Sequence, residues 1–187
     1  EKWSGRPFFE KEGDRITLSE LERACGELND YFSFILPKEP TVDCILDRAR
    51  YEVIRNGING LLIDPWNELE HMRPAAQTET EYISESLGKL RRFAKENNIA
   101  LWLVAHPTKM QRVEKGSPIY EVPTPYDIAG SANWRNKADN CITVYRNADS
   151  VDIHIQKIRV KEIGQVGTAR FTYKKSTGEY FPVKGAF

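Results

Sequence analysis

Apolar residues in the first half of the chain follow two patterns, the 3.6-residue spacing of amphipathic helices and the short continuous runs of buried strands. Three stretches have helical spacing, and each follows a threonine that can cap a helix: Thr17, Thr41 and Thr78. Thr17 and Thr78 are each followed three residues later by a glutamate, which completes a capping box. We therefore predict helices over 18–28, 41–57 and 78–97.

Continuous apolar runs lie between and after these predicted helices, at 32–37, 61–63 and 100–106. Each run either ends in a proline or is followed closely by one, which prevents the strand from continuing. Helices that alternate with wholly apolar strands are typical of a parallel sheet covered by helices on both faces.

The second half of the chain has a different pattern. Residues 107–125 contain several prolines and are expected to form a loop, and a short helix is expected at 131–139. Apolar and polar residues then form strand patterns joined by turns rich in Asn, Asp and Gly, at 141–146, 151–160 and 168–175. The predicted fold class is α/β, with a mainly parallel sheet flanked by helices and an antiparallel extension of strands at the C-terminal end.

Composition narrows the possible functions. Lys plus Arg and Asp plus Glu number 27 each, so a nucleic-acid surface must be a local patch rather than a property of the whole chain. No apolar run is long enough to cross a bilayer, and no membrane partner is expected. The three cysteines lie within apolar patterns and are predicted to be buried thiols in a reducing, cytoplasmic protein.

Two predicted strands end in polar residues, Asp64 and His106. Ligands of open α/β sheets bind at the carboxyl ends of the strands, so these side chains are candidates for a site. An aspartate after an apolar strand suits a Walker B role, in which the carboxylate holds the water shell of a nucleotide-bound Mg²⁺. Alternatively, Asp64 caps the following Asp-Pro turn, and His106 is a histidine without a reactive role.

Lys157 and Arg159 lie two residues apart on a predicted strand, so both side chains point to the same face. The planar guanidinium of an arginine suits a γ-phosphate supplied by a neighbouring subunit, the use known as an arginine finger. The alternative is a solvated cationic face on an edge strand, which protects against aggregation.

In chain order, four segments resemble the helicase domain of the DnaB-like family, in its bacteriophage primase–helicase and Twinkle branch: "GLLIDPWNELEH", "LWLVAHPTK", "DIAGSANWRNKADNCITVYRN" and "IQKIRVKEIGQVGTARFTYKKSTGEYF". The first resembles the Walker B strand and the second a strand with a phosphate-sensing histidine. The third resembles a motif of Gly-Ser, Arg, Asp and Arg-Asn, and the fourth a closing Lys-x-Arg hairpin. The resemblance covers most of residues 1–183.

This resemblance implies a RecA-like ATPase that forms a ring, uses Mg²⁺ and ATP or another nucleoside triphosphate, and moves on single-stranded DNA. The resemblance implies that four residues act in catalysis. Asp64 would organise Mg²⁺ through bound water, and His106 would couple the γ-phosphate to the DNA-facing loop. Lys157 and Arg159 would contact the nucleotide of the neighbouring subunit. Arg146 and Tyr173 match positions that flank the nucleotide base. The remaining positions are those of a DNA-contacting loop and of its coupling to the nucleotide: Lys109, Arg112, Lys115, Arg135 and Asn136. Alternatively, Arg146 and Tyr173 are ordinary strand residues, and the loop cations are merely solvated.

The resemblance has one departure: the 187 residues contain no Gly-x-x-x-x-Gly-Lys-Ser/Thr sequence, the Walker A loop that holds phosphates. The expectation is a single truncated RecA-like helicase domain over 1–187, without its first strand, P-loop and catalytic glutamate. We expect this chain alone to be inactive as an ATPase. The alternative is a non-enzymatic RecA-like remnant that binds DNA or oligomerises. A third interpretation, a recombinase-type relative of RecA, fits the Lys-x-Arg hairpin less well.

Overall fold

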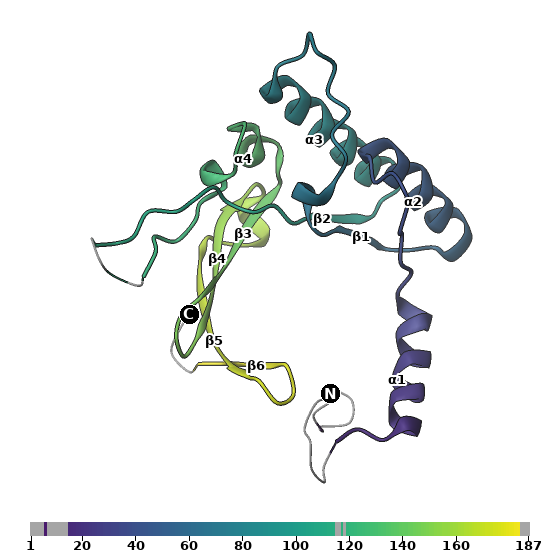
Figure 1. The fold of residues 1–187 in the computed structure, drawn as a ribbon, viewed down its shortest axis with the longest axis vertical. Helices are drawn as coiled ribbons and strands as arrows, with labels where there is room; N and C mark the ends of the chain where they lie inside the picture. Colours follow the sequence, from purple (N-terminus) through teal and green to yellow (C-terminus); the bar gives the residue numbers. More distant parts are fainter. Residues whose placement is uncertain (1–5, 7–14, 115–116, 118, 184–187) are drawn as a thin grey trace. The chain divides into compact units, whose positions relative to one another are not determined.

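The computed structural model describes residues 6, 15–114, 117 and 119–183 (Figure 1). The chain divides into two compact units. One comprises residues 35–143 and 156–165, and the other comprises the remaining residues. We describe each unit by itself. Within the described residues, no helix is both long enough and apolar enough to cross a membrane.

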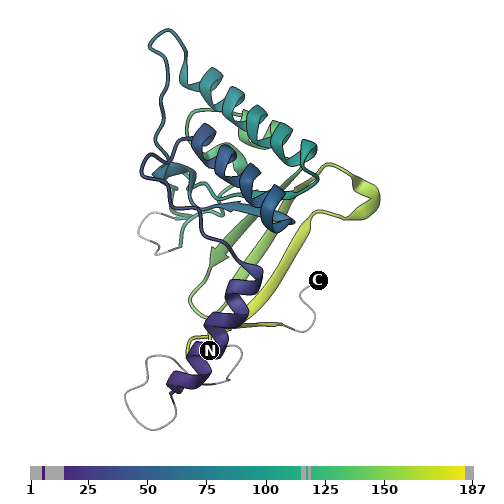
Figure 2. The same ribbon diagram turned by 90° about the vertical axis from the view of Figure 1, so that its right-hand side faces the viewer.

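The unit of residues 35–143 and 156–165 is built on a parallel pair of strands, β1 (Gly60–Ile63) and β2 (Ala100–Leu103). Two helices, α2 (Val42–Asn56) and α3 (Glu79–Glu96), lie on the same side of this pair (Figures 1 and 2). The predicted capping threonines are confirmed: Thr41 caps α2, and Thr78 caps α3 with a complete capping box. The sequence therefore set the starts of both helices through local hydrogen bonds.

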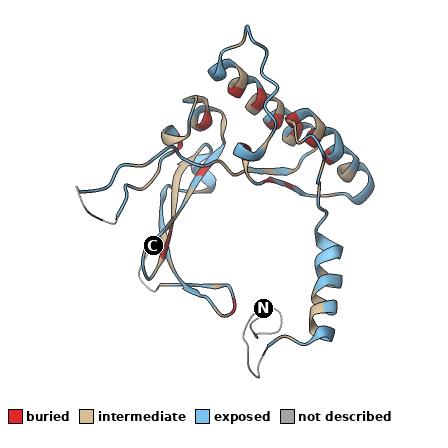
Figure 3. Cartoon of the chain, viewed as in Figure 1, coloured by how far each residue is buried: buried red, intermediate tan, exposed pale blue. Residues whose placement is uncertain are grey.

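The core of this unit lies between the two helices and one face of the strands (Figure 3). Its buried members come mainly from three elements: Val42, Ile45, Leu46 and Ala49 of α2, Leu61 and Ile63 of β1, and Ile83, Leu90 and Phe93 of α3. The opposite face is open, because Leu62 is 62% exposed and Trp102 is 57% exposed. The prediction of helices on both faces is wrong: α2 and α3 both use the face that Leu61 and Ile63 provide.

The apolar run at 32–37 is not a strand, which corrects another prediction. Phe34 and Leu36 are 81% and 85% exposed, and the segment has no regular secondary structure. A strand needs a partner for its backbone N–H and C=O groups, and none of the described strands pairs with this segment. An apolar sequence alone therefore did not produce a strand here.

Helix α1 (Leu18–Tyr31) has the predicted capping box, in which the Thr17 hydroxyl accepts from the Glu20 N–H at 3.3 Å. None of its residues is buried. Cys25 on this helix is exposed and Cys44 is half-buried, so the prediction of buried thiols holds only for Cys141. Burial raises the pKa of the Cys141 thiol, which keeps it protonated.

The other sheet has four strands in the order β3-β4-β5-β6: β3 (Asn140–Arg146), β4 (Val151–Ile158), β5 (Gly167–Lys174) and β6 (Glu179–Pro182). The β4–β5 and β5–β6 pairings are antiparallel, and β3 and β4 run from one unit into the other. The α/β class and the antiparallel extension are confirmed, but "mainly parallel" is wrong, since among the described residues only β1 and β2 pair in parallel. Strand β6, which follows the turn at 175–178, was not predicted.

Candidate functional site

Asp64 and His106 both lie just beyond the carboxyl ends of the paired strands β1 and β2. The last pair of the register is Ile63 with Leu103, and the N–H of Val104 donates to the carbonyl of Ile63 at 2.9 Å. Both candidate side chains are exposed. The parallel pairing thus brings the two polar strand ends to one edge of the sheet, as the apolar pattern predicted.

The two strand ends are also bonded to each other through Asn67, a residue that the sequence reasoning missed. The Asn67 Oδ1 accepts from the backbone N–H of His106 at 3.0 Å, and the N–H of Trp66 donates to the carbonyl of Val104 at 2.7 Å. An asparagine in the turn after Asp-Pro is a common turn residue, so its type gave no signal of this contact.

Beneath this edge, Trp66 forms the buried floor. Its ring meets the ring of Trp134 edge-on, with centroids 5.2 Å apart, and lies 4.5 Å from the ring of His71. The Trp134 Nε1–H donates to the carbonyl of Ala129 at 2.9 Å, so its one polar atom is satisfied. The turn that carries Asp64 is therefore fixed against the core on one side.

Asp64 could take part in binding a Mg²⁺ ion that is held mainly by a nucleotide and by water. Mg²⁺ in nucleotide sites keeps several waters and uses one or two carboxylates together with phosphate oxygens. A single exposed carboxylate at a strand end matches that donor set. Among the described residues, no group of three or more His, Cys, Asp or Glu side chains is placed to hold a metal without a nucleotide.

The side chain of Lys157 is bound to the C-terminal end of α4 (Asn133–Lys137). Its Nζ donates to the carbonyl oxygens of Arg135, Asn136 and Ala138, the last at 2.7 Å. Burial, together with the nearby charge of Arg159, lowers the pKa of Lys157. All three N–H donors of the ammonium therefore have partners within the same chain.

Arg159 approaches the same end of α4. Its Nη2 donates to the carbonyls of Asn136 and Ala138, each at 3.2 Å, and its Nε forms an ion pair with Asp139. The side chain of Arg159 remains 39% exposed. Asp139 also pairs with Arg91 of α3 at 3.5 Å. The prediction that Lys157 and Arg159 share a face is confirmed, and Asp139 is a partner that spacing alone did not reveal.

Arg146 and Tyr173 are brought together in the other unit. The guanidinium carbon of Arg146 lies over the Tyr173 ring, 5.6 Å from its centroid. Tyr180, directly opposite Tyr173 in the β5–β6 register, has its ring 4.9 Å away. The two residues that the resemblance assigned to a nucleotide base are therefore neighbours. Tyr180 joins them because residues opposite each other on paired strands share a face.

Residues 107–128, which we call the arm, leave β2 and return beside their starting point. The Thr108 N–H donates to the carbonyl of Asp127 at 2.7 Å, and Arg112 and Tyr120 form an antiparallel bridge. The expected loop is therefore folded back on itself, although its described residues form no strand beyond isolated bridges. Lys109 and Arg112 on the outgoing limb are exposed, and Lys115 lies outside the described residues.

The base of the arm is fixed to the strands and to α4. The carbonyl of Pro123 accepts from Thr143 Oγ1 at 3.1 Å and from Gln156 Nε2 at 2.8 Å. Arg135, one of the two predicted coupling residues, places its guanidinium 5.5 Å from the ring centroid of Tyr126. The other, Asn136, offers its carbonyl to both Lys157 and Arg159. Helix α4 thus contacts both the arm and the two predicted finger cations.

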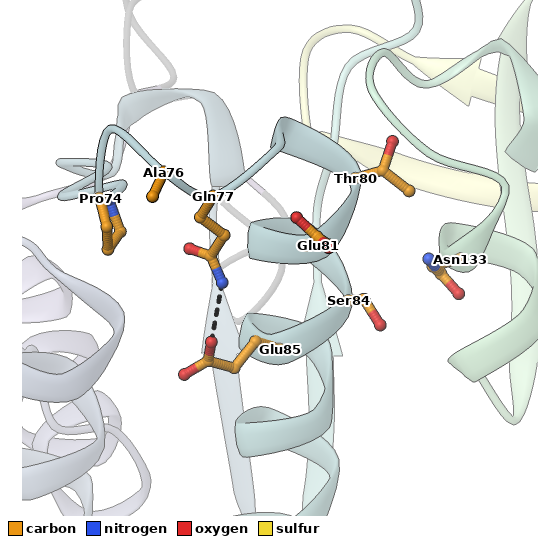
Figure 4. Close-up of a pocket in the computed structure, with 8 residues that line it drawn as sticks. All are labelled: Pro74, Ala76, Gln77, Thr80, Glu81, Ser84, Glu85 and Asn133. Carbon is orange, nitrogen blue, oxygen red and sulfur yellow. Dashed lines mark hydrogen bonds between the residues drawn. The ribbon is translucent and has the colours of Figure 1, made fainter.

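A separate pocket of about 660 Å³ lies along the first half of α3 and next to Asn133 (Figure 4). Hydroxyl, amide and carboxylate groups line it, and Gln77 Nε2 donates to Glu85 Oε2 at 2.9 Å. None of the predicted site residues lines this pocket. Its charged lining residues, Glu81 and Glu85, are both acidic, so it does not resemble a phosphate site.

This fold is that of a DnaB-like helicase domain. It is similar to the solved structure of a DnaB-like replicative helicase studied with its interactions with primase. The TM-score is 0.72 and the identity 22%, and the match covers 89% of this chain and 41% of that chain. At this identity the likeness concerns the fold alone.

The sequence comparison supports the same likeness. The chain is 40% identical over 194 aligned positions to the Twinkle homolog protein, chloroplastic/mitochondrial, of Arabidopsis thaliana. The match covers 96% of this chain and 27% of that protein, so the chain spans about a quarter of that relative's length. No family model matches the chain. The sequence and the fold together support a likeness to part of the C-terminal domain of the DnaB-like/Twinkle helicases, and the bacteriophage branch is not confirmed.

Proposed function

We propose that the chain forms part of an ATP-driven, ring-forming DNA helicase that acts in replication and moves on single-stranded DNA. One observation carries this proposal: Asp64 and His106 follow neighbouring parallel strands at one edge of the sheet. The names of the relatives, a Twinkle homolog and a DnaB-like replicative helicase, support it. We further propose that residues 1–187 belong to a single RecA-like domain.

In this proposal the edge of the sheet senses the nucleotide. Asp64 orients water bound to Mg²⁺, and the metal neutralises the phosphate charge when it is bound. His106 contacts the γ-phosphate, and the arm begins at the next residue, Pro107. The Asn67 amide, which holds the backbone of His106, fixes the distance between the two strand ends. Movement at His106 is therefore passed directly to the arm.

Lys157 and Arg159 would contact the nucleotide of a neighbouring subunit. The α4 carbonyls that now accept from both cations are the groups that a phosphate must replace. Arg159 is the better placed, because 39% of its side chain is exposed, whereas the Lys157 ammonium has all its donors engaged. Release of the α4 carbonyls would loosen the helix that carries Arg135 and Asn136, the proposed coupling residues.

Arg146 and Tyr173 would hold the nucleotide base between a guanidinium plane and a phenol ring. Both groups stack on planar ligands, and they already lie 5.6 Å apart. A base that enters between them must widen this separation, since each stacked contact needs about 3.5 Å. The contact is sequence-tolerant and suits ATP or another nucleoside triphosphate.

The arm would contact the DNA backbone through Lys109, Arg112 and Lys115. We expect binding of a fluorescent single-stranded oligonucleotide to weaken as salt rises, because phosphate contacts release counterions. Replacing the three cations with alanine should weaken binding and reduce the log–log salt slope by up to about 2, roughly 0.7 for each lost contact. Fluorescence anisotropy measures both quantities.

The matched control replaces three exposed cations of α2 and α3, Arg48, Arg92 and Lys95, with alanine. If the two triple variants bind the oligonucleotide with the same affinity, the DNA-binding assignment of the arm fails. If that shared affinity is lower than the wild-type affinity, only the overall charge of the chain matters for binding.

The second candidate is a non-enzymatic RecA-like module that binds DNA or oligomerises without ATP turnover. It is favoured for this chain alone by the absence of a Walker A sequence among its 187 residues. We propose that the chain by itself does not hydrolyse ATP, because the Walker A loop is the segment that holds the phosphates in such enzymes. Magnesium-dependent phosphate release that Asp64→Ala abolishes would refute this. A cytoplasmic location stays a prediction, since the plant relative is named chloroplastic/mitochondrial.

A further inference from the structure

We propose that Tyr120 and Tyr126 of the arm form a stacking platform for the bases of single-stranded nucleic acid. The inference rests on the proposed DNA-binding role of the arm and adds to it a contact that is not electrostatic. The two residues are separated by six positions, so they lie at most roughly 20 Å apart along the chain. Both keep a large part of their surface exposed, 42% for Tyr120 and 58% for Tyr126.

Tyr120 lies on the returning limb of the arm, opposite Arg112. The Arg112 guanidinium is over its ring, 5.5 Å from the centroid, and the Arg112 Nη1 also donates to the carbonyl of Ser117 at 3.0 Å. Arg112 is thus oriented by two contacts at once. A cation backing an exposed ring is the arrangement in which a base stacks on the aromatic surface while its phosphate meets the charge.

Tyr126 repeats this arrangement at the base of the arm. Its ring lies under the Arg135 guanidinium at 5.5 Å, and its backbone N–H donates to Thr124 Oγ1 at 3.3 Å. Thr124 and Asp127 form a complete capping box around it, and the backbone N–H of Thr124 lowers the pKa of the Asp127 carboxyl. The ring is exposed, and the turn that carries it is held by hydrogen bonds between Thr124 and Asp127.

The chemistry of the arm fits single-stranded nucleic acid better than a phosphate track alone. Lys109 and Arg112 supply charge along one limb, and Val113 and Ile119, each 56% exposed, add apolar surface beside Tyr120. Unpaired bases expose both of their faces, whereas in a duplex they are stacked on each other. Exposed rings next to arginines therefore select for unpaired strands without selecting a sequence.

The test compares two probes on the 187-residue chain. One is a fluorescent oligothymidylate of about 20 nucleotides, longer than the roughly 4–16 nucleotides that one binding module covers, and the other is an abasic phosphodiester of equal length and charge. The wild-type chain should bind oligothymidylate more tightly than the abasic strand. Tyr120→Ala and Tyr126→Ala should each weaken oligothymidylate binding roughly 5- to 150-fold and leave abasic binding within about twofold. Tyr→Phe at either position should retain wild-type affinity because the ring remains.

The control is Tyr51→Ala, because Tyr51 of α2 is also exposed, at 53%, and also lies under an arginine, Arg55. It should change neither affinity. If both probes bind equally well and with the same salt dependence, the stacking inference is overturned while the DNA-binding arm survives. If neither probe binds, the proposed function of the arm fails as well. If the alanine variants weaken both probes equally, the two rings only support the fold of the arm.

Discussion

The two units of this chain are stabilised in different ways. Around β1 and β2, apolar side chains dominate: Ala49 is completely buried, and Leu90 and Phe93 are each 2% exposed. In the described part of the other unit, the buried residues are Val151, Asp152 and Thr177, two of which are polar. The first unit has a core that holds a sheet edge in place. The second relies on paired side chains and leaves its aromatic residues accessible.

Asp152 shows how the second unit works. Its two carboxylate oxygens accept from Arg170 Nε and Nη2 at 2.6 and 2.8 Å, and Asn147 Nδ2 donates to it at 3.0 Å. These bonds tie β4, β5 and the β3–β4 turn together without a large apolar core. A bidentate carboxylate–guanidinium pair fixes geometry as well as adding energy. The comparison teaches that a thin sheet can keep its register through polar pairs.

The largest expected effect is in the apolar core. Phe93→Ala should lower the free energy of unfolding by about 3–5 kcal/mol, because it removes a buried ring and leaves a cavity between α2 and α3. Urea denaturation followed by circular dichroism measures this. Phe181→Ala is the matched change in the other unit. Its side chain is 46% exposed, so we expect a loss below about 1 kcal/mol. Equal losses of unfolding free energy in the two variants would contradict the difference in core packing between the units.

A smaller effect is expected at Asp152. The Arg170 and Asn147 hydrogen bonds hold the pKa of its carboxyl below the usual value. A lowered native pKa adds stability above the unfolded pKa of about 3.9, and that stability disappears as pH falls through the native pKa. Asp152→Asn should therefore cost about 1–2 kcal/mol at pH 7, and the difference from wild type should shrink as pH falls below about 4.

Urea midpoints measured at several pH values test the Asp152 prediction. Asp149→Asn, an exposed aspartate in the β3–β4 turn, serves as its control and should leave the midpoint unchanged. A pH-independent loss for Asp152→Asn would mean that shape, and not charge, holds β4 to β5.

Local signals in the sequence were sufficient for most elements. The Thr17 and Thr78 capping boxes formed as predicted, because both partners lie within one helical turn. Gly57 ends α2 at φ +62°, a conformation that glycine adopts without strain. The parallel pairing of 60–63 with 100–103 also followed from the apolar runs at 61–63 and 100–106, which are too short for helices, although the second strand ends at Leu103 and not at His106. The capping boxes and the Gly57 cap depend on residues close together in the chain, and the strand pairing followed from two local apolar patterns.

Contacts between distant segments escaped prediction. The segment 32–37 has the composition of a strand, but strand formation depends on a partner, which composition does not supply. The single covered face of β1 and β2 depends on where α2 and α3 pack. Asn67 and Asp139 are ordinary polar residues in the sequence, and only the fold brings them to His106 and Arg159.

The sequence by itself determined the helix starts, the polar strand ends at Asp64 and His106, and the shared face of Lys157 and Arg159. These follow from backbone periods and from capping hydrogen bonds, which act over a few residues. Only the tertiary structure decided that α4 carbonyls bind Lys157 and Arg159, that Arg146 lies over Tyr173, and that Arg135 lies over Tyr126. Such contacts join residues far apart in the chain, and their geometry exists only once strands and helices have packed.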